Sequence, residues 1–547
     1  MSRFSDGIQL SAVTSSEGLH FGEPDRLQTT SWREIATSGR RVTGVLRGAG
    51  ISAGERVAAL AASANDVAPV AQGVWGAGGA LTMLQQPTPQ ANLGEWHAAT
   101  LRTLEMLGAR VVVVGEPFLE VAPLLTQAGY HAVPTGRLWS AEEAEPMPPK
   151  DDDVALYQLT SGSTGVPKAV AITHTNLYAS VHAMRHGAGA DIEHDVMVSW
   201  LPLSHDMGMV GFLLAPMYFG FKTIYVAPTD FLKAPLSWIQ LLSNHGATMT
   251  AGPNFAYSIV HRRLKAADDD AYDLSRLRFV LCGAEPISPS TITEFVRQAT
   301  RFGMNPKAVV AAYGLAEATL AVSFTRLDEG LRVEHIDAQQ MELHRRAVLA
   351  EGGDDADKEV VIIGPPLPGF TVKVIDTAGS VLPARHLGEL LVHGDAVTKR
   401  YTTVDGDVDA VDADGWLHTG DLGYLTETGE VAICGRLKNL IIVAGRNIFP
   451  SEVEQIAEAA DGVRRGAVVA FGVELSDGRE EVTVVAETLD DYDEETRREV
   501  RRQIARSVYS VIGLSPNVVL VDKGAIPKTP SGKIRHLEAK KKFTEAK

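Results

Sequence analysis

Leu159-Thr-Ser-Gly-Ser-Thr-Gly-Val-Pro-Lys168 is the stretch that says most about the fold of this chain. Its small hydroxyl residues and two glycines allow backbone N–H groups to close around an anion, and Lys168 adds a positive charge. No Gly-Lys-Ser/Thr follows at the spacing of a Walker A loop, and residues 169–173 have the apolar pattern of a strand. We therefore expect a phosphate-binding loop that joins two strands, with a Gly/Ser-rich surface turn as the alternative.

Composition narrows the class of protein. The chain has 547 residues, of which 45% are hydrophobic and 22% charged, so it is neither disordered nor fibrous. Its net charge of −17 makes it a poor partner for nucleic acid. Two cysteines, Cys282 and Cys434, are too few for a disulfide framework or a cysteine-rich zinc site, and they suit a reducing compartment.

No targeting or membrane segment is evident. The N-terminus MSRFSDGIQL lacks the apolar core of a signal peptide. The longest uncharged apolar stretch, 207–221, is shorter than the roughly 18 to 20 residues that span a bilayer. We expect a cytoplasmic protein without a membrane span.

Strand-like and helix-like segments alternate over most of the chain, which predicts an α/β fold with helices on the faces of its sheets. After residue 364 the pattern changes to short β segments, and after about residue 435 to mixed α+β. Residues 436–547 carry 19 Lys and Arg against 18 Asp and Glu, so the negative charge lies almost wholly before them. We expect a large lobe, 1–435, with a β-rich subdomain at about 364–435, and a small lobe, 436–547.

Residues 326–358 are charged and weakly patterned, like an insertion. We expect a surface element outside the core, whose removal leaves the large lobe folded.

Four further motifs carry chemistry. Tyr313-Gly-Leu-Ala-Glu317 follows a strand-like run, where the ligand-facing residues of open α/β sheets lie. Gly415-Trp-Leu-His-Thr-Gly-Asp421 places a carboxylate after a turn, and Gly435-Arg-Leu-Lys-Asn439 begins a motif that crosses the expected boundary and extends to Glu454. Pro527-Lys-Thr-Pro-Ser-Gly-Lys533 puts a lysine in a Pro/Gly turn near the C-terminus. Taken singly, each motif also has a purely structural interpretation, as a capped turn or a solvated surface charge.

Together and in this order, the five motifs resemble those of the adenylate-forming superfamily: acyl-CoA ligases, peptide-synthetase adenylation domains and luciferases. The resemblance extends from about residue 30 to Lys533. Within that superfamily the chain looks most like the fatty acyl-AMP ligases, because of Leu201-Pro-Leu-Ser-His-Asp-Met-Gly208, Tyr313-Gly-Leu-Ala-Glu317, Gly445-Arg-Asn447 and the following Phe449-Pro450. Those ligases carry an insertion that we match to 326–358.

The resemblance implies roles for named residues, with ATP and Mg²⁺ as the cofactors. It implies catalytic roles for Lys533, His205 and Glu317, of which Lys533 bridges the carboxylate and the α-phosphate. Glu317 and Thr164 are implied as the Mg²⁺ ligands, and Lys438 as the hinge of a mobile small lobe. The implied nucleotide-binding residues are Thr160, Ser161, Gly162, Ser163, Thr164, Gly165, Lys168, Gly283, Ala284, Glu285, Tyr313, Gly314, Asp421 and Arg436.

The acid-binding region is less strongly indicated. The superfamily places an aromatic residue or a histidine near the carboxylate, and His205 matches it; a packed, hydrogen-bonded histidine is the alternative. The apolar stretch 207–221 is compatible with a pocket wall or with a buried core helix, because pocket walls and cores have the same apolar composition. The candidates for the acyl pocket are Met207, Met209, Phe212, Leu213 and Phe255.

The resemblance implies ATP-dependent activation of a hydrophobic carboxylic acid, a fatty acid or a bulky apolar acid, to an acyl-adenylate with release of pyrophosphate. No carrier segment follows Lys533, so the acceptor is expected to be separate: an acyl carrier protein, CoA or a downstream transferase. A complete acyl-CoA ligase is the alternative. An inactive nucleotide-binding protein is more remote, because Lys533 and Glu317 are both present.

Overall fold

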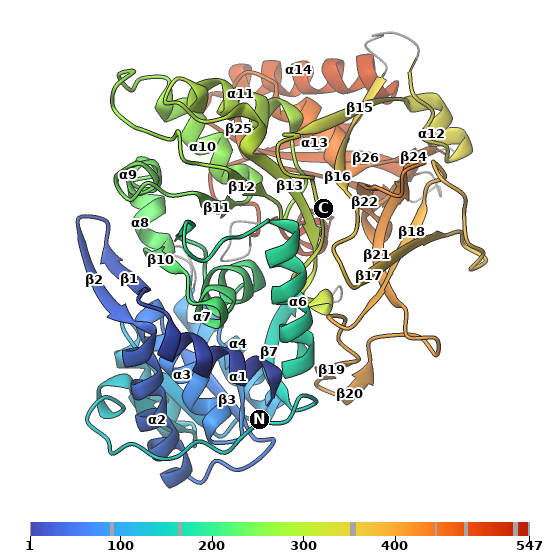
Figure 1. The fold of residues 1–547 in the computed structure, drawn as a ribbon. Coiled ribbons are helices and arrows are strands. Elements are labelled where there is room, and N and C mark those ends of the chain that lie inside the picture. Colours follow the sequence, from blue (N-terminus) through green and yellow to red (C-terminus); the bar gives the residue numbers. More distant parts are fainter. Residues whose placement is uncertain are drawn as a thin grey trace.

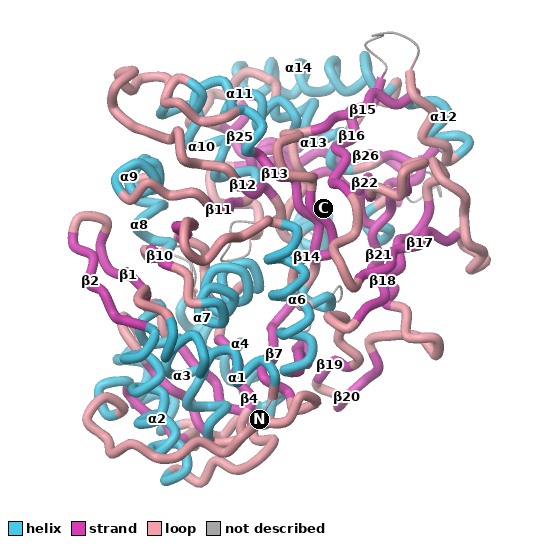
Figure 2. Tube along the Cα trace, viewed as in Figure 1, coloured by secondary structure: helices cyan, strands magenta, loops and turns pink. Residues whose placement is uncertain are grey.

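A computed structural model describes residues 2–87, 92–161, 167–350, 357–443, 446–474, 480–528 and 534–544. Across these residues the chain forms two eight-stranded sheets, a six-stranded sheet, a three-stranded sheet and a two-stranded ribbon (Figures 1 and 2). The predicted α/β class is confirmed. No helix of the described residues is long and apolar enough to cross a bilayer.

The first eight-stranded sheet has the strand order β20-β19-β8-β7-β4-β3-β5-β6. Its strands are parallel from β7 to β6 and antiparallel from β7 to β20. Its strands are β3 (Arg56–Leu60), β4 (Ala80–Met83), β5 (Val111–Val114), β6 (His131–Pro134), β7 (Val154–Ser161), β8 (Pro167–Thr173), β19 (Arg400–Thr403) and β20 (Gly406–Asp409). Because β7 and β8 pair as neighbours, the segment between them joins two strands, as predicted.

The second eight-stranded sheet has the order β14-β13-β12-β11-β9-β10-β1-β2, with six parallel strands from β13 to β1. Its strands are β1 (Gly18–Glu23), β2 (Arg26–Ser31), β9 (Val196–Ser199), β10 (Lys222–Tyr225), β11 (Met249–Gly252), β12 (Phe279–Cys282), β13 (Val309–Gly314) and β14 (Ala321–Phe324). The carboxyl ends of the parallel strands therefore meet at one edge, the usual place for a ligand.

Helices from the first half of the chain pack between and around these sheets, and one continuous apolar core joins both sheets. In α2, Ser31 and Glu34 form a capping box at the start of an amphipathic run. The helices of this lobe are α1 (Arg3–Thr14), α2 (Trp32–Gly48), α3 (Ala64–Gly76), α4 (Leu93–Leu107), α5 (Ala122–Gln127), α6 (His174–Gly187), α7 (Ala215–Phe219), α8 (Pro228–Lys233), α9 (Leu236–Asn244), α10 (Asn254–Leu264) and α11 (Pro289–Thr300). A π-helix, Met207–Leu214, leads directly into α7.

The six-stranded sheet is antiparallel throughout, in the order β15-β16-β22-β21-β18-β17. Its strands are β15 (Arg332–Asp337), β16 (Asp357–Gly364), β17 (Phe370–Ile375), β18 (Gly388–Gly394), β21 (Leu417–Leu425) and β22 (Val431–Arg436), with α12 (Ala338–His344) beside it. The β-rich subdomain therefore begins earlier in the chain than residue 364.

The C-terminal part has a core of its own, formed by a three-stranded sheet and two helices that pack on it. Figure 1 shows its longest helix, α14, in red at the top of the view. Its elements are β23 (Ile441–Val443), β24 (Arg446–Ile448), α13 (Pro450–Glu458), β25 (Val463–Glu474), β26 (Glu480–Thr488), α14 (Glu494–Ile512), β27 (Asn517–Val521) and α15 (His536–Thr544). A separate core supports a small lobe that begins near residue 436, which stays a prediction.

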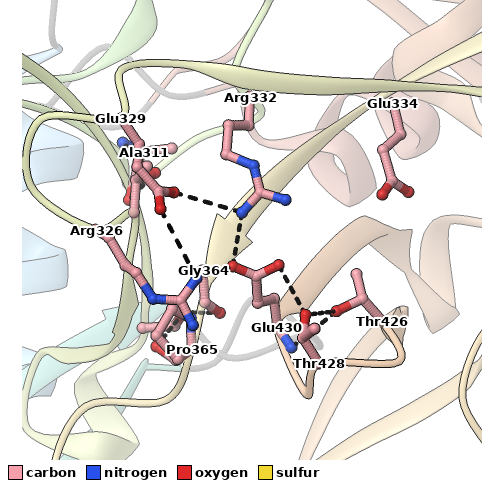
Figure 3. A network of polar contacts seen from close by, with 12 residues as sticks. Ala311, Arg326, Glu329, Arg332, Glu334, Gly364, Pro365, Thr426, Thr428 and Glu430 are labelled. Atoms are coloured by element: carbon pink, nitrogen blue, oxygen red, sulfur yellow. Dashed lines mark hydrogen bonds and ion pairs between the residues drawn. The ribbon is translucent and has the colours of Figure 1, made fainter. Parts of the chain in front are cut away.

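The expectation that residues 326–358 form a surface element outside the core is wrong. Strand β15 pairs with β16 along its whole length, and Ile336 and Met341 are fully buried. Arg326 and Arg332 both form ion pairs with Glu430, whose side chain is only 3% exposed (Figure 3). Burial acts to raise the pKa of Glu430, but hydrogen bonds from Arg332 and Thr428 outweigh it and lower that pKa. Arg326 and Arg332 of this segment therefore pair with a buried carboxylate. Removing the segment would remove the edge strand β15 from the six-stranded sheet.

Candidate functional site

One large cavity, of about 1560 Å³, lies where the two eight-stranded sheets, the six-stranded sheet and the C-terminal part meet. It is lined by most of the residues that the sequence singled out. These are Thr160, Lys168, His205, Met207, Phe212, Gly283, Ala284, Glu285, Tyr313, Gly314, Glu317, Asp421, Arg436 and Lys438. Long-range folding thus gathers residues from motifs more than 250 positions apart into one site.

Lys168 and Glu317 form the charged centre of the cavity. Lys168 Nζ lies 2.9 Å from Glu317 Oε1, and Tyr401 Oη donates to the same oxygen at 3.1 Å. The Lys168 ammonium also lies 3.8 Å from the centre of the Tyr401 ring, a cation–π contact. Burial raises the pKa of Tyr401, and the Glu317 carboxylate raises it further, so this hydroxyl remains a hydrogen-bond donor.

A second polar group sits on the six-stranded sheet. Asp421 and Arg436 face each other across β21 and β22, with Arg436 Nε 2.7 Å from Asp421 Oδ1. Tyr313 Oη donates to the other oxygen, Oδ2, at 2.7 Å. Asp421 lies in β21, the strand that follows the turn at 412–415. The Asp421 carboxylate raises the pKa of Arg436 above its usual value, which keeps the guanidinium charged.

The carboxyl ends of β12 and β13 supply the next wall. Gly283, Ala284 and Glu285 follow β12, and Glu285 Oε1 accepts a hydrogen bond from Phe255 N at 2.6 Å. On β13, a Cβ at Gly314 would lie 2.0 Å from the Leu320 carbonyl oxygen, so only glycine fits there. Gly283 and Gly314 leave parts of this wall without side chains.

His205 lies at the turn into the π-helix. Its Nδ1 is 2.8 Å from Asp206 Oδ1, and its side chain is 33% exposed. Beside it, Gln158 Nε2 donates to the Ser204 carbonyl at 2.8 Å and lines the same cavity. His205 is hydrogen-bonded and also lines the cavity, so its role near the carboxylate stays a prediction.

An apolar arm leads away from this polar centre, and two of the five residues predicted for the acyl pocket line it. Met207 and Phe212 line the arm, but Met209 and Leu213 are fully buried in the core and lie outside the lining. Phe255 packs edge-on against Trp200 instead, with ring centres 6.2 Å apart. The π-helix presents one face to the cavity and the other to the core, and composition does not distinguish them.

Several predicted residues lie outside the described residues: Gly162, Ser163, Thr164, Gly165 and Lys533, together with the side chain of Ser161. The residues that follow Lys533, from Ile534 to Glu538, line the cavity. Lys528, the second residue of the motif, and Ile534, directly after it, form an isolated β-bridge, and Arg535 N donates to Pro527 O at 3.0 Å. The described residues on both sides of 529–533 are therefore held together next to residues that line the cavity.

Sequence reasoning missed Tyr401 and the wall that the C-terminal part provides. Tyr401 stands on β19, between β20 and β8, in a segment without any catalytic motif. Glu452 and Glu454 from α13 also line the cavity. No signal in the local sequence identifies these residues, because only tertiary contacts bring them to the site.

The donor set fits Mg²⁺ held mainly through phosphate oxygens. Among the described residues, no cluster of three or more His, Cys, Asp or Glu side chains forms a self-sufficient metal site. Mg²⁺ in nucleotide enzymes needs only one or two carboxylates besides the phosphates. Glu317, at 14% side-chain exposure, is such a carboxylate.

Comparisons with known proteins agree with this geometry. The model of the AMP-binding enzyme family matches residues 12–402, and that of the AMP-binding enzyme C-terminal domain matches residues 445–540. A protein named "Putative ligase" from Mycobacterium tuberculosis strain H37Rv is 43% identical over 537 residues, covering 98% of both chains. The long-chain-fatty-acid–AMP ligase FadD23 of Mycobacterium bovis is 33% identical over 413 residues, covering 71% of this chain and 69% of its own.

Solved structures of adenylate-forming enzymes have the same fold as this chain. A structure from a study of fatty acyl-adenylate ligases from E. coli and L. pneumophila superimposes with a TM-score of 0.92 at 29% identity, covering 100% of this chain and 98% of that one. A fatty acyl-adenylate ligase from L. pneumophila in complex with acyl adenylate and pyrophosphate has a TM-score of 0.74 at 26% identity, covering 99% and 96%. The chain therefore belongs to the AMP-binding enzyme family, and it is an adenylate-forming ligase.

Proposed function

We propose that this ligase activates an apolar carboxylic acid of the fatty-acid type with ATP, and passes the acyl group from its adenylate to a separate acceptor. One observation carries the proposal: a single cavity joins a charged nucleotide end, around Lys168 and Glu317, to an apolar arm beyond Met207 and Phe212. Relatives named as fatty-acid ligases support the same substrate class.

In this proposal the acid lies in the arm with its carboxylate beside His205. A carboxylate oxygen bonds to the α-phosphorus of ATP as the bond from that phosphorus to the bridging oxygen of pyrophosphate breaks. Two anions must approach each other on an acidic protein, so local positive charge is required. Lys168 and Lys533 supply it from opposite lobes. The Asp421 carboxylate, aligned by Arg436 and Tyr313, accepts hydrogen bonds from the ribose hydroxyls.

Glu317 would hold Mg²⁺, with Thr164 as the second predicted ligand; bound there, the ion neutralises phosphate charge. Glu317 is held toward the phosphate end by Tyr401 and Lys168. This keeps the carboxylate in one position before the nucleotide arrives.

Two ion pairs between the large lobe and the C-terminal part favour a separate acceptor over free CoA. Lys358 Nζ lies 2.8 Å from Glu452 Oε2, with both side chains largely buried, and the ammonium lies 3.8 Å from the centre of the Phe449 ring. Glu342 Oε2 lies 2.8 Å from Arg446 Nη2. Both large-lobe partners belong to 326–358. We propose that these pairs restrain the small lobe, which would turn about Lys438, and so disfavour thioester formation.

Product analysis tests the function. The enzyme is incubated with ATP, Mg²⁺ and a panel of carboxylic acids, with and without CoA, and the products are separated by mass. We expect acyl-adenylate and pyrophosphate with apolar acids, and little acyl-CoA. Robust acyl-CoA formation would instead make the protein a complete acyl-CoA ligase. Absence of pyrophosphate exchange with every acid would contradict the proposed activity itself.

Removing the inter-lobe pairs tests the restraint. The double variant Glu342→Gln, Lys358→Met should raise acyl-CoA formation about five-fold or more, since 1 kcal/mol shifts an equilibrium by about that factor. Glu143→Gln, which breaks an ion pair with Arg40 within the large lobe, is the matched control. If both variants form adenylate normally and neither gains acyl-CoA activity, these pairs do not restrain the lobe.

A further inference from the structure

The apolar arm runs along one strand of the second eight-stranded sheet. Phe279, Leu281 and Gly283 all line the cavity. Alternate residues of a strand face one side, so the arm follows the length of β12. At a rise of about 3.3 Å per residue, the arm extends roughly 13 Å from Gly283, at the nucleotide end, to Phe279.

The far end of the arm lies at the amino-terminal edge of the sheet. Met249 is in register with Phe279 on one side and with Met197 on the other, and all three line the cavity. These residues lie in the first or second position of three parallel strands. The arm therefore ends at the opposite edge of the sheet from Gly283 and Tyr313.

Helix α6 forms the facing wall with one stripe of its surface. Val181, Met184, Arg185 and the adjoining Ala188 line the cavity. Their spacing of three, one and three residues places them on a single face of a helix. Three members of the stripe are apolar and buried, whereas Arg185 is partly exposed. A charged side chain thus stands within an otherwise apolar wall.

Contacts place Arg185 at the far end. Its Nε donates to the Ala190 carbonyl at 3.3 Å, and its guanidinium carbon lies 4.9 Å from the centre of the Phe219 ring. The turn at 188–190 is held to the amino-terminal edge of the sheet by Arg278, the residue before Phe279. Arg278 donates a hydrogen bond to the Ala188 carbonyl at 2.9 Å.

The charge of Arg185 has no carboxylate paired with it in the part of the chain that the structure describes. Arg278 forms an ion pair with Asp195, but no carboxylate of the described residues forms one with Arg185. Its neighbour His182 has a pKa lowered by burial and then by the positive charges of Arg185 and Arg3. Arg3 is paired with Asp151, which leaves Arg185 as the cation beside His182 with no such ion pair among the described residues. A guanidinium has five N–H donors, and one protein acceptor accounts for only one of them.

We propose that the acid activated by this enzyme bears an oxygen acceptor, a carboxylate or a hydroxyl, at the end remote from its reacting carboxylate, and that Arg185 binds it. This inference rests on the proposed function. The apolar arm holds the hydrocarbon body, while the guanidinium selects the far end, which makes Arg185 a specificity-determining residue. Such polar recognition discriminates strongly, because an acid that ends in methyl leaves the donors without a partner.

The test compares acids of equal chain length that end in carboxylate, hydroxyl or methyl, over a series of lengths. Pyrophosphate exchange gives kcat/KM for each acid with wild-type enzyme and with Arg185→Met. At the length that fits, the wild type should prefer an oxygen-ended acid over the methyl-ended acid. Arg185→Met should lose roughly 10- to 100-fold on the preferred acid, the usual range for hydrogen bonds to a charged group, and keep its rate with the methyl-ended acid. The preferred end group tells carboxylate from hydroxyl.

Two controls exclude a merely structural effect. Arg263→Met removes an exposed helical arginine whose only side-chain contact among the described residues is a weak bond to Ile259 O, and it should leave the preference unchanged. Arg185→Lys keeps the charge without the planar fork and should retain part of the preference. An equal preference for methyl-ended acids in wild type and Arg185→Met would overturn the role of Arg185. No exchange with any acid would instead refute the proposed function.

Discussion

Lys533→Ala is expected to lower the rate of adenylate formation by about 10² to 10³ while the fold stays intact. One preorganised charge that contacts the transition state contributes roughly 3 to 4 kcal/mol. Lys528 and Ile534, on either side of the segment that contains Lys533, form a β-bridge, and residues 534–538 line the cavity. This anchoring would carry its ammonium to the carboxylate and α-phosphate. The direct measurement is the first half-reaction, followed as acyl-adenylate formed in a single turnover.

The control for Lys533→Ala is Lys540→Ala. Lys540 is an exposed lysine of α15, seven residues further along the chain, and it lies outside the cavity lining. Its removal should change neither the rate nor the thermal unfolding temperature. Near-normal adenylate formation by Lys533→Ala would show that another group bridges the two reactants.

Glu317→Gln is expected to lower kcat/KM for ATP by roughly 10- to 100-fold at low Mg²⁺, with partial recovery at high Mg²⁺. The substitution keeps size and removes charge, so metal affinity is the property that falls. It also leaves Lys168 without its ion-pair partner. A titration of activity against Mg²⁺ separates the effects, because only the metal defect is relieved by more metal.

Two further variants sharpen the Glu317 experiment. Tyr401→Phe removes the hydroxyl that holds Glu317 Oε1 but leaves the carboxylate, so it should cost less and depend less on Mg²⁺. Glu427→Gln changes a carboxylate that pairs with Arg385 away from the cavity, and it should have no effect. If Glu317→Gln binds and uses ATP normally at every Mg²⁺ concentration, its carboxylate is purely structural.

Short stretches of the sequence determine many of the strands and helices and indicate the superfamily. Strands Val111–Val114 and Phe279–Cys282 are continuous apolar runs in the sequence, which is the pattern of parallel strands buried on both faces. The predicted phosphate-binding loop rests on residue types that determine local backbone shape. Five such motifs in order are enough to indicate the adenylate-forming superfamily, because each is a short local pattern of residues.

Only the tertiary structure decided features that depend on partners far along the chain. The segment with Arg326 and Arg332 resembles a charged surface insertion in the sequence, because the carboxylate that pairs with both arginines, Glu430, lies about 100 residues away. Tyr401 enters the site only because β19 pairs with β8. Arg185 resembles any exposed helical arginine until the arm beside it is known. The local sequence pattern determines which helices and strands form. The burial of a side chain and its charge partner depend on distant parts of the chain that pack against these elements.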